Sequence, residues 1–332
     1  MLNTLQSDDV ATALGLVLRH LAARNYRFTT PTPLTHQRVL AHRGLQMAAN
    51  LRDVFGWNMP FKIATCDGMS RELLAAMRGA GVLQTRGDVL QSRVRVASIG
   101  DDLFVHSAHP TTQDDAVFFG PDTYRFARFI QHGVAVNYLP VSLPIRILDV
   151  GCGSGAGGVV AARALTHLGP LEVSMNDINP LALQYTAVNA AFANIAVKPA
   201  LGNALRAVKG DFDLIISNPP YLEDAAKRAY RHGGAGLGRA LSVRMGEEAI
   251  ARLAPGGRLL LYTGVAVVGG VDAFLADMQP LLTDGKLGAQ FDWSYAEIDP
   301  DVFGEELEQP AYRQVDRIAA VGLTVTRKLG AL

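Results

Sequence analysis

Four short apolar segments place the strongest constraint on what this chain of 332 residues can fold into. Within each segment, apolar residues follow one another without alternating with polar ones, which is typical of strands covered by helices on both faces. The segments are residues 145–150, 171–177, 212–217 and 257–263. Helix-like segments lie between them, at 155–168, 180–193 and 239–254. Repeated strand–helix units predict an α/β fold with a doubly wound, mostly parallel sheet.

The last part of the chain departs from this pattern. Residues 289–299 and 315–327 both have the composition of strands, and no clear helix separates them. An antiparallel hairpin at the edge of the sheet is the simplest arrangement for such a pair. With a further candidate strand at 196–201, the sheet is expected to be seven-stranded.

The length of the chain suggests about two domains, because single domains commonly hold ~100–200 residues. We predict a first domain over residues 1–112 that is mainly helical, ends in a β-hairpin and recognises the substrate. Apolar residues at helical spacing indicate helices at 8–24 and 36–55. Alternating segments on either side of Gly100 predict the hairpin. The second predicted domain is residues 113–332.

The charges of the chain are balanced, with 31 basic and 31 acidic residues, so no overall field draws it to nucleic acid or to a membrane surface. Two cysteines are too few for a disulfide framework. The sequence opens without a secretory signal and contains no run of ~18 apolar residues, so we expect a cytoplasmic protein without membrane contact. His106 and His109 have no carboxylate or cysteine cluster near them in the sequence, and no metal site is expected.

A glycine-rich loop follows the first of the apolar segments. It runs from Asp149 through Gly151 and Gly153 to Gly155, between a predicted strand and a predicted helix. The glycines let the backbone turn tightly and leave room for a ligand against the main chain. Their spacing also fits a dinucleotide fingerprint, so a nicotinamide cofactor stays open on this loop alone. Asp149 favours S-adenosyl-L-methionine, because its carboxylate repels a diphosphate and pairs with an ammonium group.

Polar residues also follow the next two candidate strands. Asp177 ends the segment 171–177, where a carboxylate can accept both ribose hydroxyls of either cofactor. Its alternative role is to cap the helix that begins near Pro180, although Asn179 is an equally good cap. Asn203 is a candidate contact to the adenine edge, or an ordinary turn residue.

The motif Asn218-Pro219-Pro220-Tyr221 decides between the two cofactors. Its prolines stiffen the loop and remove two N–H donors, so the backbone offers carbonyl oxygens without competing donors. Asn218 Oδ1 and the Pro219 carbonyl are predicted to accept the two hydrogens of a planar –NH2 group, on which Tyr221 stacks. Positioning of that nitrogen for transfer of a sulfonium methyl group is the chemistry that such a receptor supports. A rigid turn after a strand is the plain alternative.

These motifs together resemble a known enzyme family. The runs DVGCGSGAG and IISNPPY, with an acid that ends the second strand, are similar to class I S-adenosylmethionine-dependent amino-methyltransferases with an (Asn/Asp)-Pro-Pro-(Tyr/Phe) motif. Within this group the chain is most similar to HemK/PrmC-type protein-glutamine N5-methyltransferases and to the small-domain methyltransferases that act on adenine or guanine in RNA. The resemblance covers roughly residues 115–265 and implies a Rossmann-like methyltransferase fold.

The resemblance also implies roles for individual residues. The target nitrogen is implied to lie against the residues of the Asn-Pro-Pro-Tyr motif. The methionine end of the cofactor is implied to lie against the glycine loop, and its ribose against Asp177. The run FFGPDTYRF resembles a Pro-x-Thr segment that touches the cofactor in glutamine methyltransferases. It adds Asp122 and Thr123 to the candidate cofactor-binding residues Asp149, Gly151, Gly153, Gly155, Asp177 and Asn203.

A basic segment follows the motif, over residues 227–244. Its positively charged or titratable residues are Lys227, Arg228, Arg231, His232, Arg239 and Arg244. Such a segment can hold phosphates of RNA, contact an acidic protein surface, or simply be solvated. Because the net charge near zero argues against a dedicated nucleic-acid enzyme, a glutamine side chain of a protein is the favoured acceptor. An exocyclic adenine or guanine amine in RNA or DNA is the alternative.

Overall fold

The computed structural model describes residues 2–111, 113–135, 138, 142–228, 230–284 and 288–330, with side chains described from residue 9 onward. The chain forms two compact units that alternate along the sequence. The first unit comprises Met1–Tyr124, Gly153–Ala156 and Leu181–Ala196, and the second comprises the rest of the chain. The domain boundary expected near residue 112 stays a prediction.

In its described residues, the first unit begins with helices and continues with two hairpins. The helices are α1 (Leu2–Ala22), α2 (Pro33–Arg43), α3 (Leu51–Phe55) and α4 (Arg71–Gly79), and a short 3-10 turn η1 spans Ile63–Thr65. The antiparallel hairpins pair β1 (Leu83–Arg86) with β2 (Val89–Ser92), and β3 (Val94–Ile99) with β4 (Asp102–Ser107). The pair β3–β4 corresponds to the predicted hairpin, whereas β1 was not indicated by the sequence pattern.

Side-chain caps determine where the shorter helices begin. The hydroxyl of Thr32 accepts a hydrogen bond from the Thr35 amide at the start of α2, and Asn50 and Ser70 cap α3 and α4 in the same way. A single helix over 36–55 is therefore wrong. Gly44 takes a positive φ of 59° and ends α2, and the chain becomes helical again only after Asn50.

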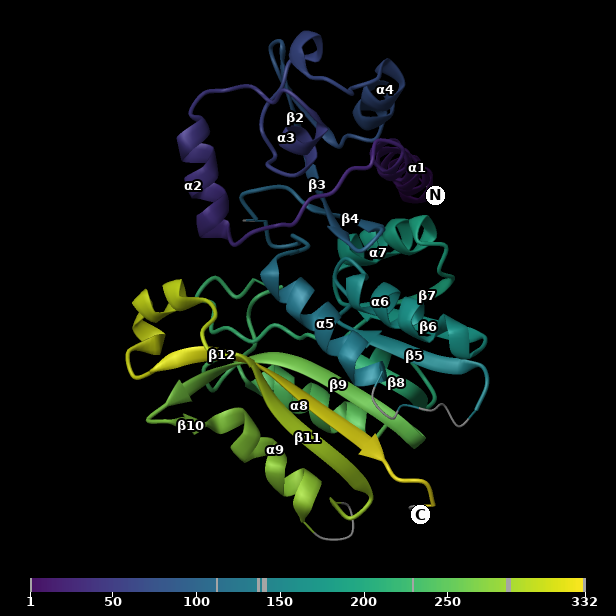
Figure 1. Cartoon of the computed structure of the whole chain (residues 1–332), viewed down its shortest axis with the longest axis vertical. Helices are drawn as coiled ribbons and strands as arrows, with labels where there is room; N and C mark the ends of the chain where they lie inside the picture. The colour runs from purple at the N-terminus through teal and green to yellow at the C-terminus, as the bar shows by residue number, and fades with distance from the viewer. Residues whose placement is uncertain are drawn as a thin grey trace. The chain divides into compact units, whose positions relative to one another are not determined.

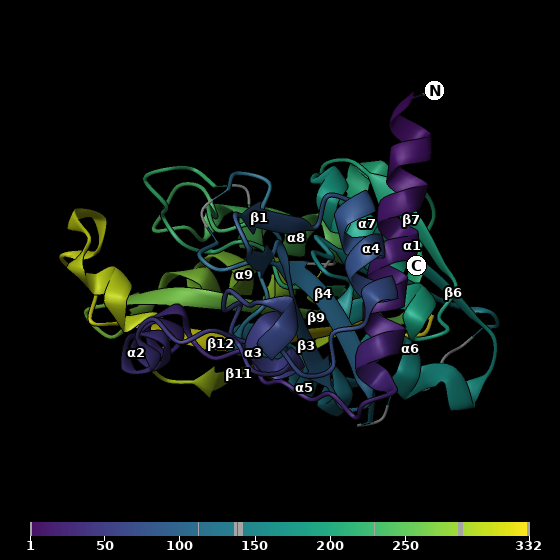
Figure 2. The ribbon, with the colours of Figure 1, turned by 90° about the horizontal axis from the view of Figure 1, so that it is seen from above.

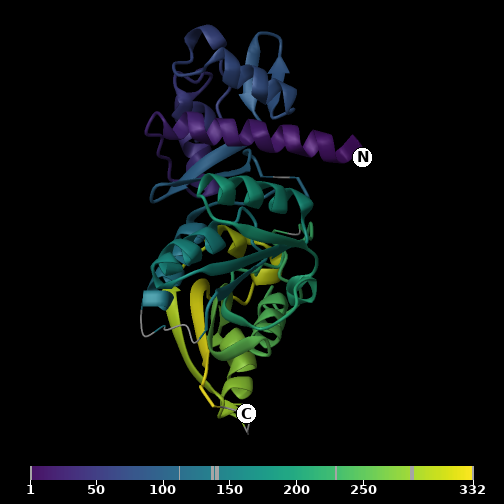
Figure 3. The same ribbon diagram turned by 90° about the vertical axis from the view of Figure 1, so that its right-hand side faces the viewer.

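The core of the first unit forms where helices and hairpins bury their apolar faces. Helices α1 and α4 lie side by side in this unit (Figure 2) and contribute leucines such as Leu14, Leu18 and Leu73. Figure 3 shows α1, in purple, along its whole length. Val96 and Val105, which are Cα partners in β3 and β4, complete the same core.

The second unit is built on one mixed sheet with the strand order β11-β12-β9-β8-β5-β6-β7 (Figure 1). The two-residue strand β10 (Val271–Asp272) pairs with β9 outside this path. Strands β5, β6, β7, β8 and β9 are parallel to one another, and β12 and β11 extend the sheet beyond β9 in antiparallel orientation. The strands are β5 (Ile145–Val150), β6 (Leu171–Asp177), β7 (Val197–Leu201), β8 (Phe212–Ser217), β9 (Leu253–Val268), β11 (Phe291–Asp299) and β12 (Arg317–Arg327). This order confirms the predicted α/β class, with β10 added to the seven expected strands.

Helices α6 (Ala156–Leu165), α7 (Pro180–Phe192) and α8 (Ala240–Ile250) connect parallel strands, as the alternating pattern predicts. Helix α5 (Pro121–Ala135) precedes β5, and α9 (Ala273–Thr283) lies between β10 and the antiparallel strand β11. Short 3-10 turns are η2 (Thr166–Leu168), η3 (Ala204–Ala207), η4 (Gly304–Glu308) and η5 (Pro310–Tyr312). Helices α8 and α9 pack on each other and on β9, where Met245, Met278 and Leu261 are buried.

The register of the parallel strands brings four chain segments to one edge of the sheet. Val150 of β5 is the Cα partner of Asn176 in β6 and of Ser217 in β8. Asp177 of β6 is in turn opposite Leu201 of β7. The segments that follow β5, β6, β7 and β8 therefore all leave the sheet at its carboxyl edge, which is where ligands bind in open α/β sheets. Among the residues that the structure describes, no helix is both long and apolar enough to cross a membrane.

Candidate active site

The glycine loop after β5 depends on backbone conformations that glycine adopts without strain. Gly151, Gly153 and Gly155 have φ values of 70°, 55° and 77°. A Cβ added to Gly151 or Gly153 would meet nothing within 4 Å, so the main chain is open at both positions. A Cβ on Gly155 would lie 3.0 Å from the Thr186 side chain, which packs closely there. The loop thus leaves backbone accessible for a ligand, as the sequence predicts.

Asn189 of α7 is a buried residue of this region that the sequence analysis missed. Its Nδ2 donates to the Ser154 carbonyl at 2.9 Å and to the Val105 carbonyl at 3.0 Å, and its Oδ1 accepts from the Val105 amide. These bonds tie part of the glycine loop to strand β4 inside the first unit. No sequence pattern marks an asparagine in the middle of a helix as important, so its role became visible only from its hydrogen bonds in the structure.

Asp149, the last acidic residue of β5, is 1% exposed and lies at the amino end of α6. Its Oδ2 accepts a hydrogen bond from the Gly158 amide at 2.7 Å, and a Cβ on Gly157 would approach the same oxygen to 3.0 Å. The pKa of Asp149 is raised to about 7, chiefly because the carboxyl is buried. The Gly158 hydrogen bond opposes this rise, and the nearby Asp177 carboxylate adds to it. A cation beside Asp149 would favour the ionised form.

Asp177 and Asn203 lie at the ends of the next two strands, as predicted. Asp177 Oδ1 accepts from the Asn179 amide at 2.9 Å, a turn contact just ahead of α7. Asn203 is exposed, and its Oδ1 accepts from Arg244 at 3.1 Å. The neighbouring Asn176 is fully buried and donates to the carbonyls of Gly202 and Ala204, which holds the β7–η3 turn against β6. The ribose and adenine contacts of Asp177 and Asn203 stay predictions.

Asp122 and Thr123 open helix α5 and belong to the first unit. Asp122 is 5% exposed, and the Thr123 hydroxyl accepts a hydrogen bond from the Gly120 amide at 3.3 Å. The Thr123 amide returns a bond to the Gly120 carbonyl at 3.0 Å, so the segment forms a tight helix start. Their cofactor contact also stays a prediction.

The Asn-Pro-Pro-Tyr motif leaves β8 with an open pair of acceptors. Asn218 is half-buried, and neither its side-chain amide nor the Pro219 carbonyl forms a hydrogen bond with any residue that the structure describes. Tyr221 is 7% exposed, and within the described chain its buried hydroxyl has no partner. Two oxygens at the sheet edge are thus free to accept the N–H groups of a ligand.

The Tyr221 ring is held by two residues far along the chain. It lies directly on Gly264 of β9, where an added Cβ would overlap the ring. On another side it meets Phe303 edge to face, with ring centroids 5.8 Å apart at 73°. Phe303 has a φ of 54°, an uncommon conformation for an aromatic residue. Neither Gly264 nor Phe303 carries a sequence signal that links it to the motif.

Replacing Gly264 by alanine tests whether the ring position matters. We expect turnover to fall about 10-fold to 100-fold because the added methyl group displaces Tyr221, while affinity for S-adenosylhomocysteine stays within about 2-fold. The matched control is Gly304→Ala, whose Cβ would meet only Asp301 at 4.0 Å. Initial rates and calorimetric titrations measure the two quantities. Equal turnover in both variants would show that the ring position is unimportant.

The segment after the motif folds back onto the motif's own backbone. The Leu222 amide donates to the Arg231 carbonyl at 3.1 Å, and the Gly233 amide donates to the Leu222 carbonyl at 2.8 Å. Gly238 has a φ of 87°, and a Cβ at this position would overlap the Tyr221 carbonyl. The glycines of this segment therefore permit a close approach that a side chain would prevent.

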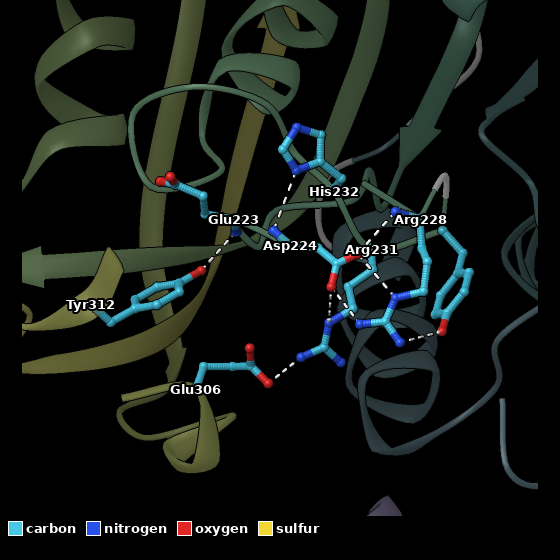
Figure 4. Close-up of polar contacts among 8 residues, drawn as sticks. Glu223, Asp224, Arg228, Arg231, His232, Glu306 and Tyr312 are labelled. Carbon is cyan, nitrogen blue, oxygen red and sulfur yellow. Dashed lines mark hydrogen bonds and ion pairs between the residues drawn. The ribbon is translucent and has the colours of Figure 1, made fainter. Parts of the chain in front are cut away.

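The arginines of the basic segment are paired with carboxylates (Figure 4). Asp224 binds Arg228 through both carboxylate oxygens and lies 3.5 Å from Arg231, which also pairs with Glu306. The hydrogen bonds from Arg228 lower the pKa of Asp224 to about 2. Outside the view, Arg239 meets Asp277 at 2.7 Å. Arg244 lies 3.8 Å from Glu248 as well as contacting Asn203.

The same network anchors the segment to the turns η4 and η5. The Glu223 amide donates to the hydroxyl of the buried Tyr312 at 2.7 Å, and the Asp224 amide donates to His232 Nδ1 at 3.3 Å (Figure 4). Lys227 is exposed, and no carboxylate in the described ranges pairs with it. The segment is thus a folded, largely charge-compensated element next to the motif. In the described part of the chain, no three His, Cys, Asp or Glu side chains gather to hold a metal ion.

Strands β5 and β8 are neighbours, with Val150 opposite Ser217, so the glycine loop and the Asn-Pro-Pro-Tyr motif begin at the same edge of the sheet. Residues 133–265 match the family model of the methyltransferase small domain. This segment contains the glycine loop, Asp177 and the whole Asn-Pro-Pro-Tyr motif. The chain therefore carries a methyltransferase small domain, which confirms the predicted family and, with it, S-adenosyl-L-methionine as the cofactor of this domain.

Two groups of curated relatives share this region. A release factor glutamine methyltransferase of Deinococcus radiodurans is 39% identical over 128 residues, which are 35% of this chain and 44% of the relative. A ribosomal RNA small subunit methyltransferase C of Haemophilus influenzae is 30% identical over 125 residues, which are 37% of this chain and 36% of the relative. The chain thus spans less than half the length of these two relatives.

A solved structure is also similar. It is a methyltransferase from Pyrococcus furiosus, with a TM-score of 0.41 and 18% identity, over 64% of this chain and 89% of that one.

Proposed function

We propose that the protein transfers the methyl group of S-adenosyl-L-methionine to a planar amide or amine nitrogen. The observation that carries this proposal is the open pair of acceptors, the Asn218 side chain and the Pro219 carbonyl, at the sheet edge shared with Gly151 and Asp177. Two acceptor oxygens, Asn218 Oδ1 and the Pro219 carbonyl, suit a ligand that donates through an –NH2 group. The acidic, glycine-rich loop beside them suits a cationic cofactor.

The residues present fit the cofactor chemically. Asp149 is a buried carboxylate with a raised pKa, which an ammonium group would neutralise, and the main chain at Gly151 and Gly153 is open. S-adenosyl-L-methionine supplies an electrophilic methyl group on a sulfonium. Asp149 would hold the amino group, Asp177 the ribose hydroxyls, and Asn203 the adenine edge.

The Asn-Pro-Pro-Tyr motif would position the target nitrogen for methyl transfer and would not act as a strong base. An amide nitrogen is a weak nucleophile because its lone pair is delocalised into the π-system. Asn218 Oδ1 and the Pro219 carbonyl would hold both N–H bonds and favour a pyramidal nitrogen whose lone pair points along the transfer path. Tyr221 would cover the acceptor plane. The methylated nitrogen becomes acidic and loses its proton afterwards.

For the acceptor we favour a glutamine side chain of a protein. The chain has no net charge, and four arginines after the motif are paired with carboxylates, which leaves little free positive charge for phosphates. A relative that is 39% identical in this region is a release factor glutamine methyltransferase. Because another relative is a ribosomal RNA methyltransferase, an exocyclic base amine is the second candidate acceptor.

A methyl-transfer assay with tritium-labelled cofactor distinguishes the two acceptors. The purified protein is added to extract of a strain that lacks the gene. The labelled product is then split into two samples, one digested with protease and the other with nuclease, and the remaining tritium is counted in each. We expect label that protease removes and nuclease leaves, incorporated at an initial rate about 10²-fold to 10³-fold lower with Asn218→Ala. Label that only nuclease removes would replace glutamine by a nucleobase as the acceptor. No label in either fraction would contradict both macromolecular acceptors.

A further inference from the structure

A buried guanidinium in the first unit has no counter-charge. Arg95 lies on β3 and is 4% exposed. Its Nε donates to the Ser107 carbonyl at 3.1 Å. Its two terminal nitrogens donate no hydrogen bond to any described residue, and in the described part of the chain no carboxylate lies within ion-pair distance. The charge is therefore enclosed by protein without an anion.

Three histidines interact electrostatically with this guanidinium. His106 is the Cα partner of Arg95 across the β3–β4 hairpin and is fully buried. His36 of α2 is 1% exposed and lies against the half-buried His109, with ring centroids 4.1 Å apart and the ring planes tilted by 32°. Within the described ranges, the rings of His36 and His106 make at most one weak polar contact each, with the backbone of Trp57 and of Ser107 respectively. One charged donor group and three imidazole rings, each with one N–H donor when neutral, thus belong to the same cluster.

The electrostatics agree with this arrangement. Burial, His109 and Arg95 lower the pKa of His36 to about 3, and burial and Arg95 lower the pKa of His109 to about 4. Burial and Arg95 also lower the pKa of His106. All three rings are then neutral at pH 7. The titratable groups that interact with the guanidinium are Tyr26, Tyr124, His36, His106 and His109. None of them supplies a negative charge at neutral pH.

A second buried arginine shows how the fold usually satisfies such a group. Arg258, in the second unit, is 9% exposed and donates to the Gly133 carbonyl at 2.6 Å and to the Thr326 hydroxyl at 3.0 Å. Its guanidinium also lies over the Tyr138 ring. Arg95 has one such bond. An isolated buried charge is costly unless something pairs with it, so the Arg95 cluster has the character of an incomplete ion-binding site.

We propose that Arg95, His36, His106 and His109 form a binding site for a phosphate group in the first unit. The planar guanidinium offers two free donor nitrogens to an oxyanion, and the histidine rings can add donors on other sides. A tetrahedral phosphate has enough acceptor oxygens for all of them, whereas a carboxylate has two. A metal cation is disfavoured by the charge of Arg95. The site is independent of the proposed methyl transfer, because it uses none of the residues assigned to that reaction.

Thermal unfolding of the full chain with inorganic phosphate tests this proposal. A ligand at ten times its Kd is expected to raise the unfolding midpoint by about 3 °C relative to sodium chloride of equal ionic strength. Arg95→Met removes the guanidinium but keeps an unbranched apolar chain, and it is expected to abolish the rise. Arg93→Gln is the matched control, because Arg93 is exposed two residues earlier, and its variant should keep the full rise.

A second measurement keeps the proposal testable if Arg95→Met does not fold. In the unaltered protein, phosphate should shift the histidine ring resonances of the cluster, with saturation at the same concentration as the thermal effect. An equal rise with sodium acetate, an equal rise in Arg95→Met, or unmoved histidine resonances would each overturn the proposal.

The same assay separates two sources of the phosphate. Adenosine monophosphate that competes with inorganic phosphate would indicate the terminal phosphate of a nucleotide, with adenosine as the control that must not compete. Binding of inorganic phosphate without such competition would indicate the free ion. Either result supports the site.

Discussion

Replacing Asn218 by alanine is expected to lower the turnover number about 10²-fold to 10³-fold, the scale seen when one preorganised polar group is removed from an active site. The side-chain amide makes no hydrogen bond within the described chain, so its loss should leave the fold intact. Affinity for S-adenosylhomocysteine should change less than about 2-fold, because Asn218 is assigned to the acceptor and not to the cofactor.

Single-turnover rates and calorimetric titrations of the same preparation separate these two effects. Asn218→Asp is the matched variant, since a carboxylate also accepts two N–H bonds, and it should retain more activity than the alanine variant. Near-normal turnover of Asn218→Ala would mean that the acceptor nitrogen is held elsewhere. A parallel loss of cofactor affinity would mean that the residue serves the cofactor instead.

Cofactor binding is expected to become tighter as the pH rises from 5.5 to 7, by about tenfold for S-adenosylhomocysteine. Burial raises the pKa of Asp149 to about 7, so the carboxyl is mostly protonated at the lower pH. A bound ammonium group favours the ionised form, and binding then has to release a proton. Below pH 7 this release opposes binding, and above the raised pKa it does not. The ligand's own α-amino group stays protonated in this window, since such groups titrate near about 7.7–8.0.

The variant Asp149→Asn separates this effect from other titrations. An amide has nearly the same shape and no charge, so the variant should bind more weakly at pH 7 and show a much flatter pH dependence. Isothermal titrations in two buffers of different ionisation enthalpy would also count the released proton. A slope that persists in Asp149→Asn would assign the linkage to another group.

The strands and the motifs that leave them are largely readable from the sequence. The segments 145–150, 171–177 and 212–217 coincide with β5, β6 and β8 at both ends. Each is bounded by residues that end a strand for local reasons, such as Gly151 and Pro219, and each is apolar because helices cover both faces. Strand β9 is the exception. It extends over Leu253–Val268 because β12 pairs with it from Arg258 to Val267 and Phe212 of β8 pairs with Leu253, which a local pattern cannot show.

The surroundings of the site depend on contacts that no local pattern contains. The basic segment is charge-compensated and anchored in part through residues far along the chain. Arg231 pairs with Glu306, 75 residues later, and the Glu223 amide donates to the Tyr312 hydroxyl, 89 residues later. From the sequence alone, the acidic residues near 306 are indistinguishable from a solvated loop.

The sequence by itself determined the parallel sheet, the glycine loop and the acceptor motif, because each follows from residue types within a few positions of one another. Only the tertiary structure decided how Tyr221 is held, how the arginines after it are neutralised, and that Arg95 is enclosed without an anion. Each of these properties depends on contacts with residues from distant parts of the chain. Burial and electrostatic interactions depend on distance in space, whereas a sequence records only distance along the chain.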